Sequence, residues 1–129
     1  MATIVVYGLP DGLGEEKVSE LCELIRKATV KERELRLNIE DVLAWFNKDQ
    51  MLGDLGKEFS VRIEGIKILP ADEHKMRTVS GLLAAHLVMV IKNFFDKTEL
   101  IEFNMYFTVE GREGVCLYFS NRYRWRAQA

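Results

Sequence analysis

Hydrophobic and polar residues along this 129-residue chain alternate with a period of two in some stretches and follow helical spacing in others. The opening stretch "TIVVYG" (3–8) predicts a strand. A turn follows, marked by Gly8, Pro10, Gly12 and Gly14. From Glu15 onward, apolar residues recur every three or four positions: Val18, Leu21, Cys22, Ile25 and Ala28. This spacing predicts a helix with one buried face.

The rest of the chain repeats this order and then adds strands. A β-rich run predicts a strand at about 41–47, and a polar, glycine-bearing loop (47–56) follows it. "FSVRIEGIKIL" (59–69) predicts a third strand, closed by Pro70, and a long helix runs from Asp72–Glu73 to about Phe95. "LIEFNMYFTVEGREGVCLYF" (100–119) predicts two strands joined in a hairpin around "EGREG".

The two halves therefore share one pattern. Apolar positions of the first helix find counterparts about 58 residues later, at Met76, Val79 and Leu83. We predict a single α+β domain over 1–129, made of two βαβ repeats (about 2–47 and 59–107) and a C-terminal hairpin arm (about 108–129). Right-handed crossovers place both helices on one face of a four-stranded mixed sheet. A ferredoxin-like sandwich and the tautomerase fold both have this β-α-β-β-α-β order.

The second predicted helix is apolar on more than one side. Leucine, valine, isoleucine and phenylalanine cover well over one stripe between Leu82 and Phe95. Such a helix lies under several elements or contacts a partner chain. Together with Trp45, Phe103 and Phe107 on the strands, this surplus apolar surface predicts an oligomer.

Composition excludes several classes of protein. A net charge of −2 gives no case for general nucleic-acid or anionic-membrane binding. The most apolar run (79–91) is too short to span a bilayer, and the N-terminus has no signal-peptide pattern. Cys22 and Cys116 lack metal-type spacing and are expected to be reduced, buried thiols. We expect a cytoplasmic protein that uses no cofactor.

Few motifs suggest a metal or a catalytic group. His74 and His86 lie three turns apart on one helix, roughly 18 Å, too far to share a metal ion. The glycines after the first strand match no phosphate-binding motif and indicate a plain turn. At the C-terminus, Arg122, Arg124 and Arg126 alternate with Tyr123 and Trp125. This pattern fits either an anionic partner or, as an overall acidic chain favours, an arm whose aromatic residues dock on a neighbouring subunit.

Four blocks of sequence occur in an order that suggests a relationship. They are "LPDGL…VSELCELIRKATVK" (9–31), "NKDQM" (47–51), "SGLLAAHL" (80–87) and "IEFNMYF" (101–107). Their order and spacing resemble the tautomerase superfamily, in particular its macrophage migration inhibitory factor and D-dopachrome tautomerase branch. The resemblance implies a homotrimer in which three sheets form a barrel inside a ring of six helices, with pockets at the subunit interfaces. That assembly would cover the apolar sides of the second helix.

The resemblance also implies where catalysis would take place. In that family an N-terminal proline, exposed by removal of the initiator methionine, is the catalytic base. Ala2 occupies this position here. A primary α-amine on Ala2 would have an ordinary pKa near 8, and a retained Met1 would displace the amine by about 3.5 Å.

Other family positions can be matched one by one. Lys31 matches a lysine that pairs with a substrate carboxylate, and Asn104 matches a pocket asparagine. Ile63 or Glu64 falls near a pocket backbone position. The family's pocket tyrosine is Glu102 here, and a carboxylate there disfavours an anionic substrate.

Three functions remain open. The chain is a tautomerase-like homotrimer that has lost the proline base and acts by binding a ligand or a protein, which we favour. Alternatively, it is an isomerase that uses the α-amine of Ala2 or another pocket group on a small keto acid. The third option is a ferredoxin-like α+β binding module without a tautomerase pocket.

Overall fold

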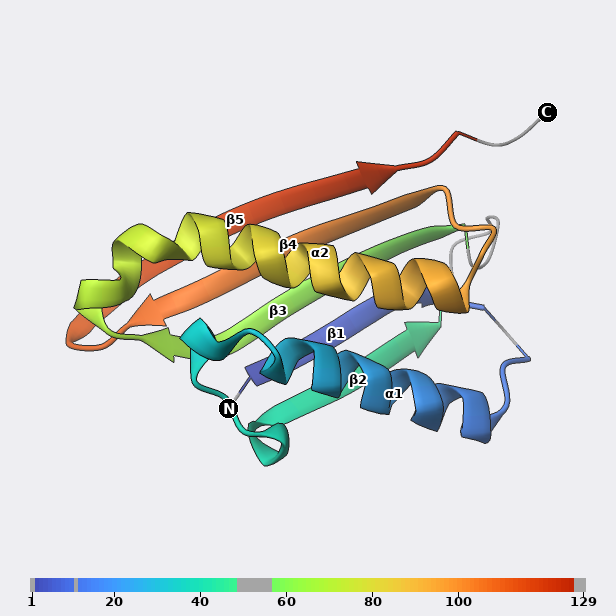
Figure 1. Cartoon of the computed structure of the whole chain (residues 1–129), viewed down its shortest axis with the longest axis horizontal. Helices are drawn as coiled ribbons and strands as arrows, with labels where there is room; N and C mark the ends of the chain where they lie inside the picture. Colours follow the sequence, from blue (N-terminus) through green and yellow to red (C-terminus); the bar gives the residue numbers. More distant parts are fainter. Residues whose placement is uncertain (1, 11, 49–56, 127–129) are drawn as a thin grey trace.

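Two βαβ units lie side by side and share one sheet (Figure 1). The computed structural model describes residues 2–10, 12–48 and 57–126. Its main elements, in chain order, are β1 (Ala2–Leu9), α1 (Glu15–Val30), β2 (Val42–Lys48), β3 (Glu58–Ile68), α2 (Met76–Phe94), β4 (Leu100–Val109) and β5 (Arg112–Arg124).

The sheet order is β2-β1-β3-β4-β5. β1 pairs in parallel with β2, and β3 pairs in parallel with β4, so a helix crosses over within each unit. The two units meet where β1 and β3 pair antiparallel. Both helices lie on the same face of the sheet (Figure 1). The predicted α+β fold is therefore confirmed.

The structure differs from the sequence prediction at three places. The second strand of the C-terminal hairpin is a fifth strand of the sheet, paired with β4 from Leu100 opposite Arg124 to Val109 opposite Arg112. Pro70–Lys75 forms a 3₁₀ turn, so α2 begins at Met76 and not at Asp72–Glu73. Two short 3₁₀ turns that the sequence did not indicate, Arg33–Leu35 and Ile39–Asp41, precede β2. Most of the predicted 47–56 loop lies outside the described residues.

The core lies between the sheet and the helices. Strand residues alternate, so that Ile4 and Val6 of β1 are fully buried beneath the helices while Val5 and Tyr7 face the other way. Leu21 and Ile25 of α1 fill the space above β1 and β2. The largest fully buried side chains come from both units: Phe103, Phe107, Ile4, Leu21, Ile25, Ile63, Ile66, Met76, Leu83, Leu87, Ile91 and Ile101.

The opposite face of the sheet carries no helix. We call it the bare face, and its exposed apolar residues are Tyr7, Leu43, Trp45 and Tyr118. The strand register places Trp45 beside Val5, and Val5 beside Arg62. The guanidinium of Arg62 lies 4.7 Å from the ring centroid of Tyr106. The bare face therefore mixes aromatic residues with a few paired charges.

α2 is apolar on more than one side, as the sequence indicated. Its sheet-facing side is buried, but Leu82 and Met89 are 48% and 59% exposed. At 100° per residue, these two residues lie on the side of α2 opposite the sheet. A partner on the bare face would not reach them.

Gly8 is the residue that lets β1 end beside β3. Its φ is +106°, and the register between β1 and β2 shifts between Tyr7 and Leu9. A Cβ atom at Gly8 would lie 2.2 Å from the main-chain oxygen of Glu58. Only glycine combines this backbone conformation with this close approach.

We therefore expect Gly8→Ala to lower the free energy of unfolding by about 2–4 kcal/mol, because the new methyl group meets a backbone oxygen that cannot turn aside. Gly81, inside α2, has no atom within 4 Å of an added Cβ. Gly81→Ala should raise the free energy of unfolding by about 1 kcal/mol. Urea unfolding of both variants measures the two changes, and equal effects of the same sign would contradict this account.

Candidate functional site

Ala2 occupies the first position of β1, beneath the helices. It pairs with Val42 of β2, and its side chain is completely buried. Burial follows from strand alternation, because Ala2 shares the inward face with Ile4 and Val6. The position that the resemblance assigns to a catalytic base thus carries a small apolar side chain packed into the core.

Ile63 and Asn104 lie on opposite faces of the sheet. Ile63 pairs with Ile4 and is fully buried under the helices. Asn104, on β4, points to the bare face, where its amide oxygen accepts a hydrogen bond from the Tyr118 hydroxyl. Within one subunit, a ligand that touches Asn104 cannot touch the side chain of Ile63.

Lys31 lies further away again. It caps the C-terminal end of α1, is exposed, and lines a cleft on the outer side of the helices together with Glu20 and Met89. Glu102, where the family has a tyrosine, forms an ion pair with Arg122 across β4 and β5 (3.3 Å). The structure therefore does not gather Ala2, Lys31, Ile63 and Asn104 in one subunit.

A cavity of about 410 Å³ lies next to the start of β1. Asp41 and Gly65 are in its wall. Asp41 directly precedes Val42, which pairs with Ala2. Gly65 directly follows Glu64, which pairs with Thr3. Its charged groups come from the turns that follow α1 and β3. Its volume suits a small ligand.

An ion-pair network holds one wall of this cavity. The largely buried carboxylate of Asp72 lies 3.7 Å from the Arg36 guanidinium and 3.8 Å from the Lys75 ammonium. Lys75 also pairs with Glu34 at 3.6 Å. Arg36 has a left-handed backbone (φ 54°), which ends the turn after α1 and places its side chain beside Asp72. Both cations are already engaged by carboxylates, which offset the positive charge of the wall.

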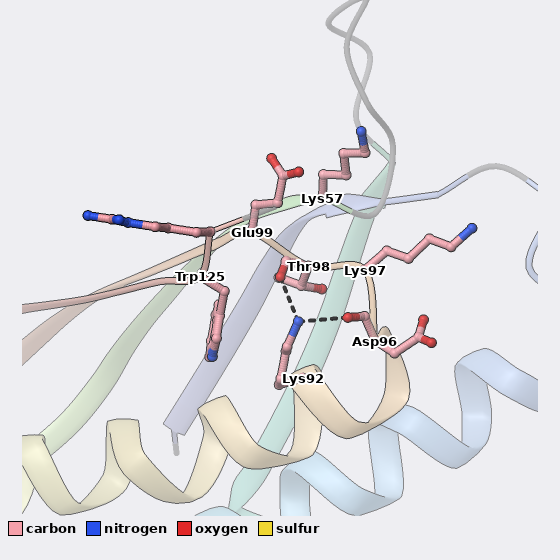
Figure 2. Close-up of a pocket in the computed structure, with 8 residues that line it drawn as sticks. Lys57, Lys92, Asp96, Lys97, Thr98, Glu99 and Trp125 are labelled. Atoms are coloured by element: carbon pink, nitrogen blue, oxygen red, sulfur yellow. Dashed lines mark hydrogen bonds between the residues drawn. The ribbon is translucent and has the colours of Figure 1, made fainter. Parts of the chain in front are cut away.

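A second cavity, of about 540 Å³, lies at the opposite end of the sheet, where β3 and β4 begin and β5 ends (Figure 2). The Lys92 ammonium donates hydrogen bonds to the main-chain oxygens of Asp96 and Thr98, both at 2.7 Å. It also lies 4.9 Å from the centre of the Trp125 ring. The main-chain N–H of Trp125 donates a hydrogen bond to the main-chain oxygen of Glu99. Lys92 thus joins the end of α2, the loop before β4 and the end of β5.

The aromatic residues of the C-terminal segment dock on their own chain. Tyr123 packs edge-on against Phe103 at 5.9 Å and stacks with Trp125 at 6.5 Å, while Arg122 and Arg124 are exposed. The predicted alternation is confirmed. The hairpin keeps β5 within its own sheet, and the docking of these aromatic residues on a neighbouring subunit stays a prediction.

In the part of the chain that the structure describes, two ionisable groups have shifted pKa values. Partial burial raises the pKa of the Cys22 thiol above its ordinary value, so this thiol is a poor nucleophile. On the bare face, the Glu64 carboxylate accepts a hydrogen bond from Arg62 Nε (3.0 Å) and raises the pKa of that guanidinium. Both cysteines are free, as predicted, but Cys116 is exposed and Cys22 only partly covered, so the expectation of buried thiols is wrong.

Among the residues that the structure describes, no three His, Cys, Asp or Glu side chains form a group that could hold a metal ion. Within the same residues, no helix is long and apolar enough to cross a membrane.

Sequence reasoning missed several polar residues that join separate elements of the fold. Arg36, Asp72 and Lys92 are separated along the chain and match no motif. Only their positions signal a role in holding the connections between elements. Arg36 and Asp72 lie in the turns that follow α1 and β3, and Lys92 lies in the last turn of α2.

No protein-family model and no curated protein matches this sequence. Solved structures do resemble it. A fused 4-OT wild-type asymmetric trimer superposes with a TM-score of 0.63 at 17% identity, and native fused 4-OT with a TM-score of 0.58 at 18% identity. Pt0534 inactivated by 2-oxo-3-pentynoate superposes with a TM-score of 0.60 at 11% identity. Each of these alignments covers 88% of this chain and 91% of the other.

Fused 4-OT proteins belong to the tautomerase superfamily, so this chain has a tautomerase-like fold. Identities this low establish the fold alone.

The Lys92 contacts make a testable contribution to stability. Lys92→Met keeps the apolar stem but leaves two carbonyl oxygens without their charged donor, so the free energy of unfolding should fall by about 1–2 kcal/mol. Lys97→Met, in the loop that follows α2 and in the wall of the same cavity, is the matched control and should change the free energy of unfolding by less than about 0.5 kcal/mol. Urea unfolding distinguishes them, and indistinguishable midpoints for Lys92→Met and the unmodified chain would contradict the role of Lys92.

Proposed function

We propose that this protein is a homotrimer of the migration inhibitory factor type that acts by binding a small ligand or a protein partner. It does not catalyse keto–enol tautomerisation by the family's proline mechanism. The observation that carries this proposal is the buried Ala2 side chain at the position of the catalytic proline.

Proton transfer at this position needs a neutral amine in contact with substrate. A secondary amine in an apolar pocket loses its proton readily because desolvation lowers its pKa. Alanine provides at most a primary amine, with an ordinary pKa near 8. The neighbouring groups do not compensate for this loss. Asn104 already bonds Tyr118, and Glu102, paired with Arg122, stands where the resemblance places a pocket tyrosine.

The bare face supports assembly into a trimer. Trp45 is 59% exposed there, and Leu43 and Tyr7 are each 42% exposed. Such a contiguous apolar face is typical of an interface. Three of the structures with this fold are described as trimers, two asymmetric and one symmetric. In a trimer built on the bare face, Asn104 of one subunit would face its neighbours and the cavity at the start of β1 would lie near a subunit boundary.

The catalytic half of this proposal is tested with phenylpyruvate. We expect no keto–enol turnover above the uncatalysed rate for the natural sequence. Ala2→Pro, with intact mass confirming removal of Met1, should gain at least about tenfold, because it restores a secondary amine. Ala2→Gly, which keeps a primary amine, is the control and should stay inactive.

Turnover by the natural sequence would contradict the proposal and favour the isomerase that uses the Ala2 amine. If Ala2→Pro is folded, processed and still inactive, the cavity is not a tautomerase pocket. Covalent labelling by 2-oxo-3-pentynoate, which inactivated Pt0534, gives an independent readout of a nucleophilic amine, and we expect none on the natural chain.

The assembly is tested by mass in solution. We expect the mass of three chains for the natural sequence and that of one chain for Trp45→Lys, because a charge would be buried in the interface. Leu82→Lys, at an exposed leucine on the side of α2 opposite the sheet, should leave the trimer intact. A natural sequence that stays monomeric at millimolar concentration would contradict the trimer and favour a ferredoxin-like binding module.

A further inference from the structure

A second apolar surface lies on the outer side of the helix layer. Leu24 of α1 is 40% exposed, and Leu82 and Met89 of α2 are 48% and 59% exposed. Between the helices is a cleft of about 500 Å³. We call it the helix groove, and its lining residues are Glu20, Leu24, Ala28, Lys31, His86, Met89, Val90, Asn93 and Phe94.

An assembly on the bare face leaves the helix groove uncovered. The sheet separates the two surfaces, because both helices lie on one side of it (Figure 1). Leu82 and Met89 are seven residues apart on the same stripe of α2, directed away from the sheet. The surplus apolar side of α2 therefore needs a different partner.

The charges at the two ends of the helix groove have opposite signs. Glu20 lies at one end and Lys31 at the other, eleven residues along α1 and about 16 Å apart. Glu16 in the first turn of α1 and Lys27 in its last turn add to this polarity, whereas Lys17, which lies over Phe94 at the acidic end, offsets part of it. α2 runs antiparallel to α1, since Lys17 at the start of α1 lies over Phe94 at the end of α2 (6.0 Å).

A surface that is acidic at one end, apolar in the middle and basic at the other is complementary to itself. A two-fold axis through its centre brings Glu20 of each copy to Lys31 of the other, and brings the two apolar centres together. We infer that the helix groove is a two-fold interface between copies of this chain. This inference does not depend on the proposed trimer, because it concerns the opposite side of the molecule.

The size of the surface sets the expected affinity. Two helices about 25 Å long with axes about 10 Å apart present on the order of 500 Å² per copy. Two copies bury about 1,000 Å² in total, at the lower limit for a specific interface. Pairing through the helix groove is therefore weak and concentration-dependent, and it doubles the mass of whatever assembly the bare face forms.

Charge-reversal variants test this interface, with the strength of pairing measured by sedimentation velocity over a range of protein concentrations. Lys31→Glu and Glu20→Lys each place like charges at both ends of the paired grooves, so each should weaken pairing at least about fivefold. The double variant Glu20→Lys/Lys31→Glu restores opposite charges and should recover pairing to within about twofold of the natural sequence. Met89→Lys should abolish pairing, because it buries charges at the apolar centre.

The Trp45→Lys background keeps this test separate from the trimer. There, pairing through the helix groove should convert one-chain species to two-chain species as concentration rises. Constant mass up to about 1 mM would overturn the inference and assign the helix groove to a different molecule. Pairing that is unaffected by the single reversals, or that the double reversal fails to restore, would overturn it as well. Circular dichroism of each variant shows whether it is folded.

Discussion

The handedness of the two βαβ crossovers determines the rest of the structure. A right-handed connection between parallel strands places α1 above β1 and β2, and the antiparallel junction of β1 and β3 places α2 on the same face. One face of the sheet is therefore buried completely and the other has no cover from its own chain. Ala2 is buried, and Trp45 exposed, for this single reason.

The same arrangement separates the candidate functional groups. Ile63 and Asn104 are on neighbouring strands but on opposite faces, and Lys31 lies on the far side of the helices. The charged residues that the fold does bring together, Asp72 with Arg36 and Lys75, hold turns in place. A site that uses the predicted residues would need more than one copy of the chain.

Local patterns predict the elements well. The spacing of Val18, Leu21 and Ile25 fits only a helix, and the alternation of Val61 and Ile63 fits only a strand. The sequence predicts a separate arm where the structure has the fifth strand. The hairpin signal shows that two strands are joined by a turn, but it does not define which strands pair along the whole sheet. The start of α2 was misplaced because Asp72 and Glu73 suit a 3₁₀ turn as well as a helix start. The cavities were not predictable, because their walls combine residues from distant turns.

The fluorescence of Trp45 tests the central claim, that other copies of the chain cover the bare face. The chain has two tryptophans, so Trp125→Phe leaves Trp45 as the only one. If the bare face is an interface, its emission should be blue-shifted and weakly quenched by iodide, and should move to longer wavelength on dilution. Emission and quenching equal to those of free tryptophan in water, at every protein concentration, would contradict the account.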